Sequence, residues 1–136
     1  MAREAQPVIW MNGKFVKWDD ANIHVMSHVV SYGSSVFEGM RIYKTVNGPA
    51  AFRLADHTER LFNSAKVYRM VIKHTPEEID SAILELASRN GVEEGYVRPI
   101  AYRGYGTLGV DPTAWCVAVA DLHAAVNLRE REPPLS

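Results

Sequence analysis

Residues 34–43 read SSVFEGMRIY, and their β-branched and aromatic side chains favour a β-strand. The turn residues Asn47-Gly48-Pro49 follow this strand and precede residues 50–53, so a second strand is expected to pair in this region. Upstream, Asn12-Gly13 lies between two apolar stretches, which is typical of a two-residue hairpin turn. This part of the chain is therefore predicted to form two strand pairs.

Two helices are predicted after these strands. Asp56 and Glu59 have the spacing of a capping box, which indicates a helix from Asp56 to about Arg69. Its apolar stripe consists of Leu61, Phe62, Ala65 and Tyr68. Residues 75–78, TPEE, combine a threonine cap with proline at the first helical position, so a second helix begins there and ends at Asn90-Gly91. Its inward-facing positions are Ile79, Ile83, Leu86 and Ala87.

Two further strands are predicted in the last third of the chain. The alternation in residues 96–103, YVRPIAYR, puts Tyr96, Arg98, Ile100 and Tyr102 on one face. Pro99 has no N–H, so this strand is expected at a sheet edge or with a bulge. Residues 115–120, WCVAVA, indicate a strand buried on both faces. The sum is an α/β (α+β) domain with a mixed, largely antiparallel sheet, two packed helices and no internal repeat.

The composition fits one globular domain of 136 residues, with 47% hydrophobic and 23% charged residues. A net charge of -1 provides no field that would recruit nucleic acid or an anionic membrane. Cys116 is the only cysteine, which excludes an internal disulfide and a thiolate zinc site, and its apolar surroundings indicate a buried structural thiol. Without a secretory signal or a membrane-length apolar segment, the protein is expected to be cytoplasmic.

Three separated segments carry a resemblance to a known family. Residues 27–43 read SHVVSYGSSVFEGMRIY, residues 57–61 read HTERL, and residues 96–99 read YVRP. In this order and at these distances they resemble the N-terminal half of a branched-chain amino acid aminotransferase, a fold type IV enzyme that uses pyridoxal phosphate. The resemblance implies that residues 1–120 are the small domain, that residues 121–136 are a divergent tail, expected to be disordered, and that the chain lacks the large cofactor domain.

The resemblance also assigns roles to individual residues. Arg60 matches the position that contacts the cofactor phosphate, and a guanidinium in the first turn of a helix suits an anion. The alternative is an arginine paired with Glu59 or Asp56 on a solvated face. Arg98 matches the residue that meets a substrate carboxylate. The other residues implied in substrate binding are Tyr96 as a pocket wall, Phe37, Gly39 and Arg41 along the side-chain pocket, and Tyr32, Leu108 and Val110, which are lent to the neighbouring subunit of a dimer.

The family's Schiff-base lysine belongs to its second domain, so no catalytic residue is expected in this chain. None of the lysines matches the family's lysine motif, and each is expected to be solvated; they are Lys14, Lys17, Lys44, Lys66 and Lys73. The implied reaction moves the amino group of leucine, isoleucine or valine to 2-oxoglutarate and yields a branched 2-oxo acid and glutamate. By itself the chain is expected to be an inactive half of such an enzyme, with an exposed apolar surface that favours self-association.

Other interpretations stay open at this point. A related D-amino acid aminotransferase or aminodeoxychorismate lyase has the same fold, and a non-catalytic dimerisation or binding module is an alternative from a different class. His24 and His28 are four residues apart, but with no third ligand and no helical pattern between them we predict no metal site. Residues 104–109, GYGTLG, resemble a glycine-rich phosphate loop only loosely, since the Lys-Ser/Thr ending is missing.

Overall fold

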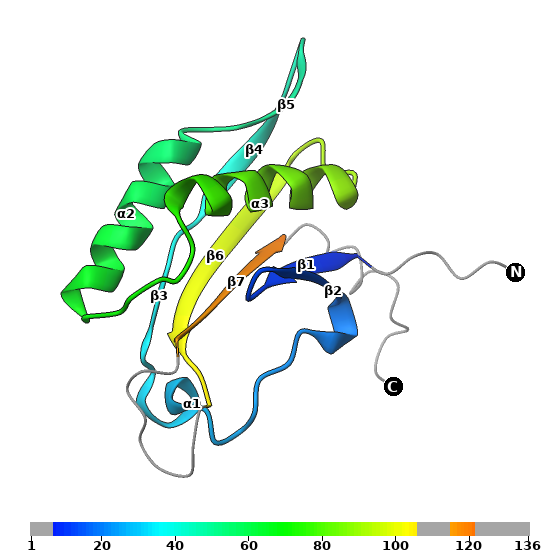
Figure 1. Ribbon diagram of the computed structural model, residues 1–136. Helices are drawn as coiled ribbons and strands as arrows, with labels where there is room; N and C mark the ends of the chain where they lie inside the picture. Colours follow the sequence, from blue (N-terminus) through cyan, green and yellow to red (C-terminus); the bar gives the residue numbers. More distant parts are fainter. Residues whose placement is uncertain (1–6, 106–114, 122–136) are drawn as a thin grey trace, which may run out of the picture.

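The structure, a computed structural model, describes residues 7–105 and 115–121 (Figure 1). Within these two ranges, seven strands, two long helices and two short helical segments follow one another. They are β1 (Val8–Met11), β2 (Lys14–Lys17), the 3-10 helix η1 (Trp18–Asp20), α1 (His28–Tyr32), β3 (Ser35–Phe37), β4 (Met40–Thr45), β5 (Gly48–Ala51), α2 (Leu54–Val67), α3 (Pro76–Arg89), β6 (Gly95–Arg103) and β7 (Trp115–Asp121).

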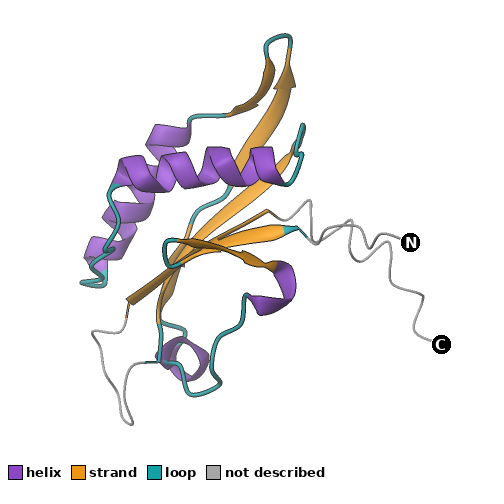
Figure 2. Ribbon diagram, turned by 45° about the vertical axis from the view of Figure 1, so that its right-hand side comes forward, coloured by secondary structure: helices purple, strands orange, loops and turns teal. Residues whose placement is uncertain are grey.

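The strands form one sheet in the order β2-β1-β7-β6-β4-β5, with β3 also paired to β6. Every strand pairing among the described residues is antiparallel. Helices α2 and α3 lie together against one face of this sheet (Figures 1 and 2). The predicted class, an α+β domain with a largely antiparallel sheet and two packed helices, is confirmed. Among residues 7–105 and 115–121, no helix has the length and apolar content needed to cross a membrane.

Both predicted hairpins are present. Asn12 and Gly13 have φ angles of 51° and 88°, the positive values that a type I′ turn requires, and Met11 pairs with Lys14 across it. In the second hairpin Thr45 pairs with Gly48, so the turn residues between the strands are Val46 and Asn47. The turn therefore begins one residue before the predicted Asn47-Gly48-Pro49.

The core lies between the sheet and the two helices. The buried side chains of α3 follow the predicted helical spacing. The main contributors are Ile79, Ile83, Leu86 and Ala87 from α3, Leu61 and Ala65 from α2, and Met40, Ile42, Val97 and Val119 from the sheet. Buried apolar area of this kind is the dominant favourable contribution to folding.

The predicted start of the first helix is wrong by two residues. Helix α2 begins at Leu54, and Arg53, with a φ angle of 53°, takes the N-cap position without a side-chain cap. The Asp56 carboxylate cannot cap the helix because it lies inside the first turn, where it accepts a hydrogen bond from Arg53 Nε at 2.8 Å. At the other end, Tyr68 follows the helix and is exposed instead of extending the apolar stripe.

The predicted start of the second helix is confirmed. Thr75 is the N-cap of α3 and its Oγ1 accepts from the backbone N–H of Glu78 at 3.2 Å, while Pro76 is the first helical residue. Asn90 and Gly91 follow the last turn as expected, and the positive φ angle of Gly91, 64°, suits a helix end.

Replacing Thr75 with alanine is expected to lower the free energy of unfolding by about 1 kcal/mol, because the Glu78 N–H loses its acceptor. Urea unfolding followed by circular dichroism measures the change. Thr75→Ser is the control, since it keeps a hydroxyl at the same place. Equal losses in the two variants would contradict a capping role.

The predicted edge position of the Pro99 strand is wrong. Strand β6 lies inside the sheet, between β7 on one side and β3 and β4 on the other. The sheet accommodates Pro99 by a break in the neighbouring strand. Glu38 N–H donates to the Pro99 carbonyl at 3.0 Å, but the return bond would need the N–H that proline lacks. The expected single strand over residues 34–43 is therefore divided into β3 and β4.

Some predictions fall on parts of the chain outside the described residues. These are the tail beyond Asp121, the side chain of Cys116, the glycine-containing loop after Tyr105, and the two residues Leu108 and Val110. The backbone of β7 agrees with the strand predicted over residues 115–120.

Candidate functional site

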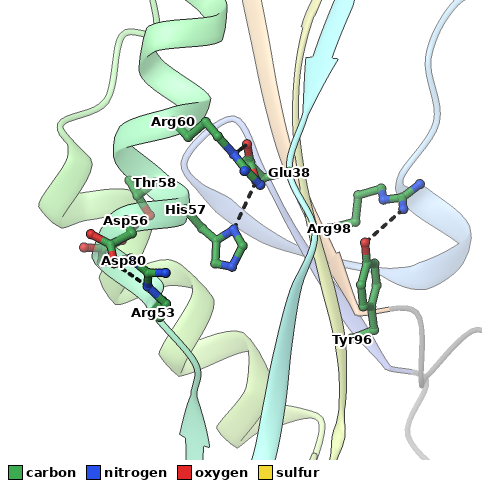
Figure 3. Close-up of polar contacts among 9 residues, drawn as sticks. All are labelled: Glu38, Arg53, Asp56, His57, Thr58, Arg60, Asp80, Tyr96 and Arg98. Carbon is green, nitrogen blue, oxygen red and sulfur yellow. Dashed lines mark hydrogen bonds and ion pairs between the residues drawn. The ribbon is translucent and has the colours of Figure 1, made fainter.

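The break between β3 and β4 separates two groups of polar side chains, one on each face of the sheet (Figure 3). Successive side chains of a strand point to opposite faces. Val36, Met40 and Ile42 face the helices and belong to the core. The side chain of Glu38 also points to the helix face, where it contacts residues of α2. Gly39 faces the opposite side of the sheet.

On the face away from the helices, β6 holds Tyr96 and Arg98 together. Arg98 Nη2 donates to Tyr96 Oη at 3.3 Å. The guanidinium carbon of Arg98 also lies 4.5 Å from the ring centroid of Phe37 on β3, within the range of a cation–π interaction. The Phe37 ring remains exposed on its other sides. The three side chains form a polar and aromatic surface on one face of the sheet.

One donor of Arg98 lacks an acceptor in the part of the chain that the structure describes. Its Nε is buried and has no hydrogen-bond partner among the described residues. A buried N–H without an acceptor is unfavourable, and a carboxylate oxygen of a ligand would satisfy it with a charge-assisted hydrogen bond. The group therefore fits an anionic ligand at this position.

Gly39 is required by the close approach of Tyr96. A Cβ atom at position 39 would lie 1.6 Å from Tyr96 Oη and 2.4 Å from Cζ. Gly39 does not have a positive φ angle, so the constraint is steric and concerns the tyrosine alone. Arg41 pairs with Tyr96 across β4 and β6, and its side chain is exposed. The structure thus brings five of the predicted substrate-site residues onto one face; they are Phe37, Gly39, Arg41, Tyr96 and Arg98.

Tyr32 lies apart from these five residues. It is the last residue of α1, is exposed, and its ring packs against His28 with centroids 4.5 Å apart. Its exposed position is compatible with a contact to another molecule, and the predicted role in a neighbouring subunit's site stays a prediction.

On the helix side, Glu38 is the centre of a charged cluster. Arg60 Nε donates to Glu38 Oε1 at 2.6 Å and Arg60 Nη2 to Oε2 at 2.7 Å, while His57 Nδ1 lies 3.1 Å from Oε2. The Glu38 side chain is only 5% exposed. The hydrogen bonds from Arg60 lower the pKa of Glu38 below its ordinary value against the opposing effect of burial, and His57 lowers it further. Glu38 is therefore ionised at neutral pH.

The predicted surroundings of Arg60 need correction. Because α2 begins at Leu54, Arg60 lies beyond the first turn and is not accompanied by unpaired helix N–H groups. Its partner is neither Glu59 nor Asp56 but Glu38, which is 22 residues away in the sequence. Arg60 and Arg98 also lie on opposite sides of the broken strand (Figure 3).

Glu38 and His57 are the residues that sequence reasoning missed. A signal existed, since the alternation Val36, Glu38, Met40 puts a carboxylate in a row of side chains that point to the core. Charged residues in such positions are almost always paired. The sequence could not identify the partner.

The residues present fit parts of a cofactor site. A guanidinium has five N–H donors, and Glu38 occupies two on Arg60, so three remain on a side chain that is 66% exposed. They suit a phosphate. All five lysines are exposed, as predicted, and Lys44 pairs with Glu93 at 3.2 Å. No lysine lies among the described contacts of Arg60 or Arg98.

The two histidines considered as metal ligands have separate partners. His24 Nδ1 accepts from the Met26 N–H at 3.0 Å and its ring stacks on Tyr105, whereas His28 Nδ1 lies 2.6 Å from Ser34 Oγ. In the described part of the chain, no group of three or more His, Cys, Asp or Glu side chains is arranged to hold a metal ion.

Acid is expected to remove the stabilisation that Glu38 provides. The folded-state pKa lies below the ordinary value of 4.5, so the contribution is complete above that value and is lost as the pH falls through the lowered pKa. The free energy of unfolding of the wild type should therefore exceed that of Glu38→Gln at neutral pH and approach it in acid. Urea titrations from about pH 7 to about pH 3 measure this. A difference that does not depend on pH would contradict the assignment.

Comparisons with known proteins identify the family. The family described as Amino-transferase class IV matches residues 35–134. The chain belongs to the class IV aminotransferase family, which confirms the predicted aminotransferase resemblance.

Several relatives are branched-chain-amino-acid aminotransferases. The chain is 40% identical to the one of Escherichia coli (strain K12) over 114 residues, which covers 84% of this chain and 37% of the relative. It is 43% identical to that of Pseudomonas aeruginosa over 103 residues, which is 76% of this chain and 34% of the relative. Among solved structures, the T.th. branched-chain amino acid aminotransferase complexed with N-(5'-phosphopyridoxyl)-L-glutamate has a TM-score of 0.81 and 48% identity, over 88% of this chain and 40% of that one. The chain spans between about one third and two fifths of the length of these relatives.

Proposed function

We propose that this chain supplies the small-domain half of a branched-chain amino acid aminotransferase active site. The enzyme would move the amino group of leucine, isoleucine or valine to 2-oxoglutarate. The observation that carries the proposal is Arg98, whose buried Nε lacks an acceptor among the described residues and whose Nη2 is held by Tyr96. An arginine prepared for a carboxylate next to the exposed ring of Phe37 suits both an acidic and a branched apolar substrate.

The residues of the candidate site have separate roles in the proposed reaction. Arg98 binds the distal carboxylate of glutamate or 2-oxoglutarate, and Tyr96 Oη orients it. Phe37 and Gly39 provide an apolar wall that excludes water from a branched side chain. Arg60 would hold the phosphate of pyridoxal phosphate with the N–H groups that Glu38 does not occupy. The cofactor, when bound, supplies the electron sink for the amino-group transfer.

The lysine and the acid that this cofactor needs would come from a second domain. Since no described contact joins a lysine to the arginines of the site, the 136 residues alone are expected to be inactive.

A homo-oligomer is part of the proposal. Exposed large apolar side chains precede α1 and lie in it; they are Ile23, Val25, Met26, Val30 and Tyr32. Exposed apolar side chains that gather in one segment favour association. In such a dimer, Tyr32, Leu108 and Val110 would contribute to the partner's substrate pocket. A cytoplasmic location remains a prediction from the sequence.

The test is a fusion of residues 1–120 to the large domain of the T.th. relative. We expect the fusion to transaminate leucine with 2-oxoglutarate, while the 136-residue chain with pyridoxal phosphate shows no turnover. Borohydride reduction and peptide mapping of the 136-residue chain serve as the control, with no adduct expected at any single lysine. If the fusion transaminates D-alanine but not leucine, the D-amino acid aminotransferase is favoured. Turnover by the 136-residue chain alone would overturn the proposal that a second domain supplies the lysine and the acid.

A further inference from the structure

Within the described residues, Arg60 is held on one edge of its guanidinium. The planar guanidinium presents a side edge, formed by Nε–H and one N–H of Nη2, and an end edge, formed by the other N–H of Nη2 and one N–H of Nη1; the second N–H of Nη1 points along the opposite side. Glu38 binds the side edge through two hydrogen bonds of 2.6 and 2.7 Å, the parallel geometry of a carboxylate fork (Figure 3). The end edge carries no hydrogen bond to the described residues and belongs to a largely exposed side chain.

The carboxylate that holds Arg60 is itself fixed. Glu38 is almost fully buried, its backbone N–H is bonded to Pro99, and its Oε2 is also in contact with His57. Because a guanidinium is rigid and planar, fixing its side edge also fixes the direction of its end edge. A long exposed arginine would otherwise sample many rotamers, and binding would have to order them.

We propose that Glu38 is a positioning residue for the cofactor phosphate: it holds the side edge of Arg60 so that the end edge is presented to the anion. This inference rests on the proposed function, in which Arg60 contacts pyridoxal phosphate. Glu38 does not touch the phosphate in this arrangement. Its two oxygens face the donors of Arg60 and His57, so its charge is directed into the domain.

The proposal separates orientation from charge, and Glu59 provides the matched control. Glu59 is the exposed neighbour of Arg60 on α2 and is not its hydrogen-bond partner. Glu38→Gln and Glu59→Gln both remove one negative charge from the chain, but only Glu38→Gln replaces a carboxylate oxygen of the fork by an NH2 group. If only the net charge of the chain mattered, the two variants would behave alike.

The experiment uses the 15N-labelled 136-residue chain and follows the Arg60 Nε–H signal by NMR. Pyridoxine 5′-phosphate is the probe, because it lacks the aldehyde that reacts with lysines, and pyridoxine is the phosphate-free reference. In the wild type and Glu59→Gln we expect a rigid Nε–H group whose signal shifts with the phosphate compound alone. In Glu38→Gln we expect a mobile group and a Kd raised about fivefold relative to Glu59→Gln.

The backbone amide spectrum reports whether each variant is folded. Glu38→Asp is a second variant, which keeps the negative charge but shortens the side chain by one methylene. It should raise the Kd by an intermediate factor. Equal Kd values in Glu38→Gln and Glu59→Gln would overturn the positioning role while leaving the phosphate contact of Arg60 intact. A wild type that does not respond to the phosphate compound would overturn the phosphate contact itself, and with it both this inference and that part of the proposed function.

Discussion

Replacing Gly39 with alanine is expected to reduce kcat/KM for leucine and 2-oxoglutarate about 100-fold in the two-domain fusion. The new Cβ would lie 1.6 Å from Tyr96 Oη, so the ring must move by more than about 1 Å. That movement withdraws the hydroxyl from Arg98, whose Nη2 it holds at 3.3 Å. Displacements of about 1 Å in a substrate-positioning group have effects of this size.

A double variant separates this steric effect from a general loss of stability. Tyr96→Ala removes the atoms that would collide with a side chain at position 39. If the collision is the cause, adding Gly39→Ala to Tyr96→Ala should cost little further activity, so that the two effects are strongly non-additive. Additive losses would contradict the explanation. Circular dichroism of each variant checks that the fold is retained.

Replacing Leu86 with alanine is expected to lower the free energy of unfolding by about 3 kcal/mol. The Leu86 side chain is 0% exposed in the core cluster between α3 and the sheet, so its removal leaves a cavity in addition to the lost transfer free energy. Urea unfolding of the 136-residue chain measures the change. Such a loss is a large fraction of the stability of an ordinary domain.

Leu84 offers a matched control on the same helix. Its side chain is 52% exposed, and Leu84→Ala removes the same atoms without opening a core cavity. We expect a change within about 0.5 kcal/mol. Similar losses at positions 84 and 86 would contradict the orientation of α3, which both the periodicity of the sequence and the structure assign.

Local features of the fold followed from short stretches of sequence. Asn12-Gly13 defines its turn because these residue types tolerate the positive φ angles that the hairpin demands. Thr75 and Pro76 define the start of α3 because the hydroxyl and the missing N–H act within one turn. In both cases the residues that decide the conformation are neighbours in the chain.

Predictions that depended on distant partners were less successful. Asp56 looked like a cap, but Arg53 binds its carboxylate and the helix begins earlier. Pro99 suggested an edge strand or a bulge, yet the sheet keeps its strand inside, and the neighbouring strand is interrupted at Glu38. Each of these two sequence patterns was compatible with two structures. Which structure forms depends on residues outside the pattern, such as Arg53 for Asp56 and the strand next to Pro99.

The residues of the candidate site divide in the same way. The sequence by itself determined the family, through three motifs in order, and placed Arg98 and Tyr96 on one face of a strand. Only the tertiary structure decided that Glu38 holds Arg60 and that Gly39 makes room for Tyr96. The physical reason is that backbone conformation depends on interactions between near neighbours, whereas hydrogen bonds and steric fit depend on which distant side chains the folded sheet and helices bring within about 3 Å.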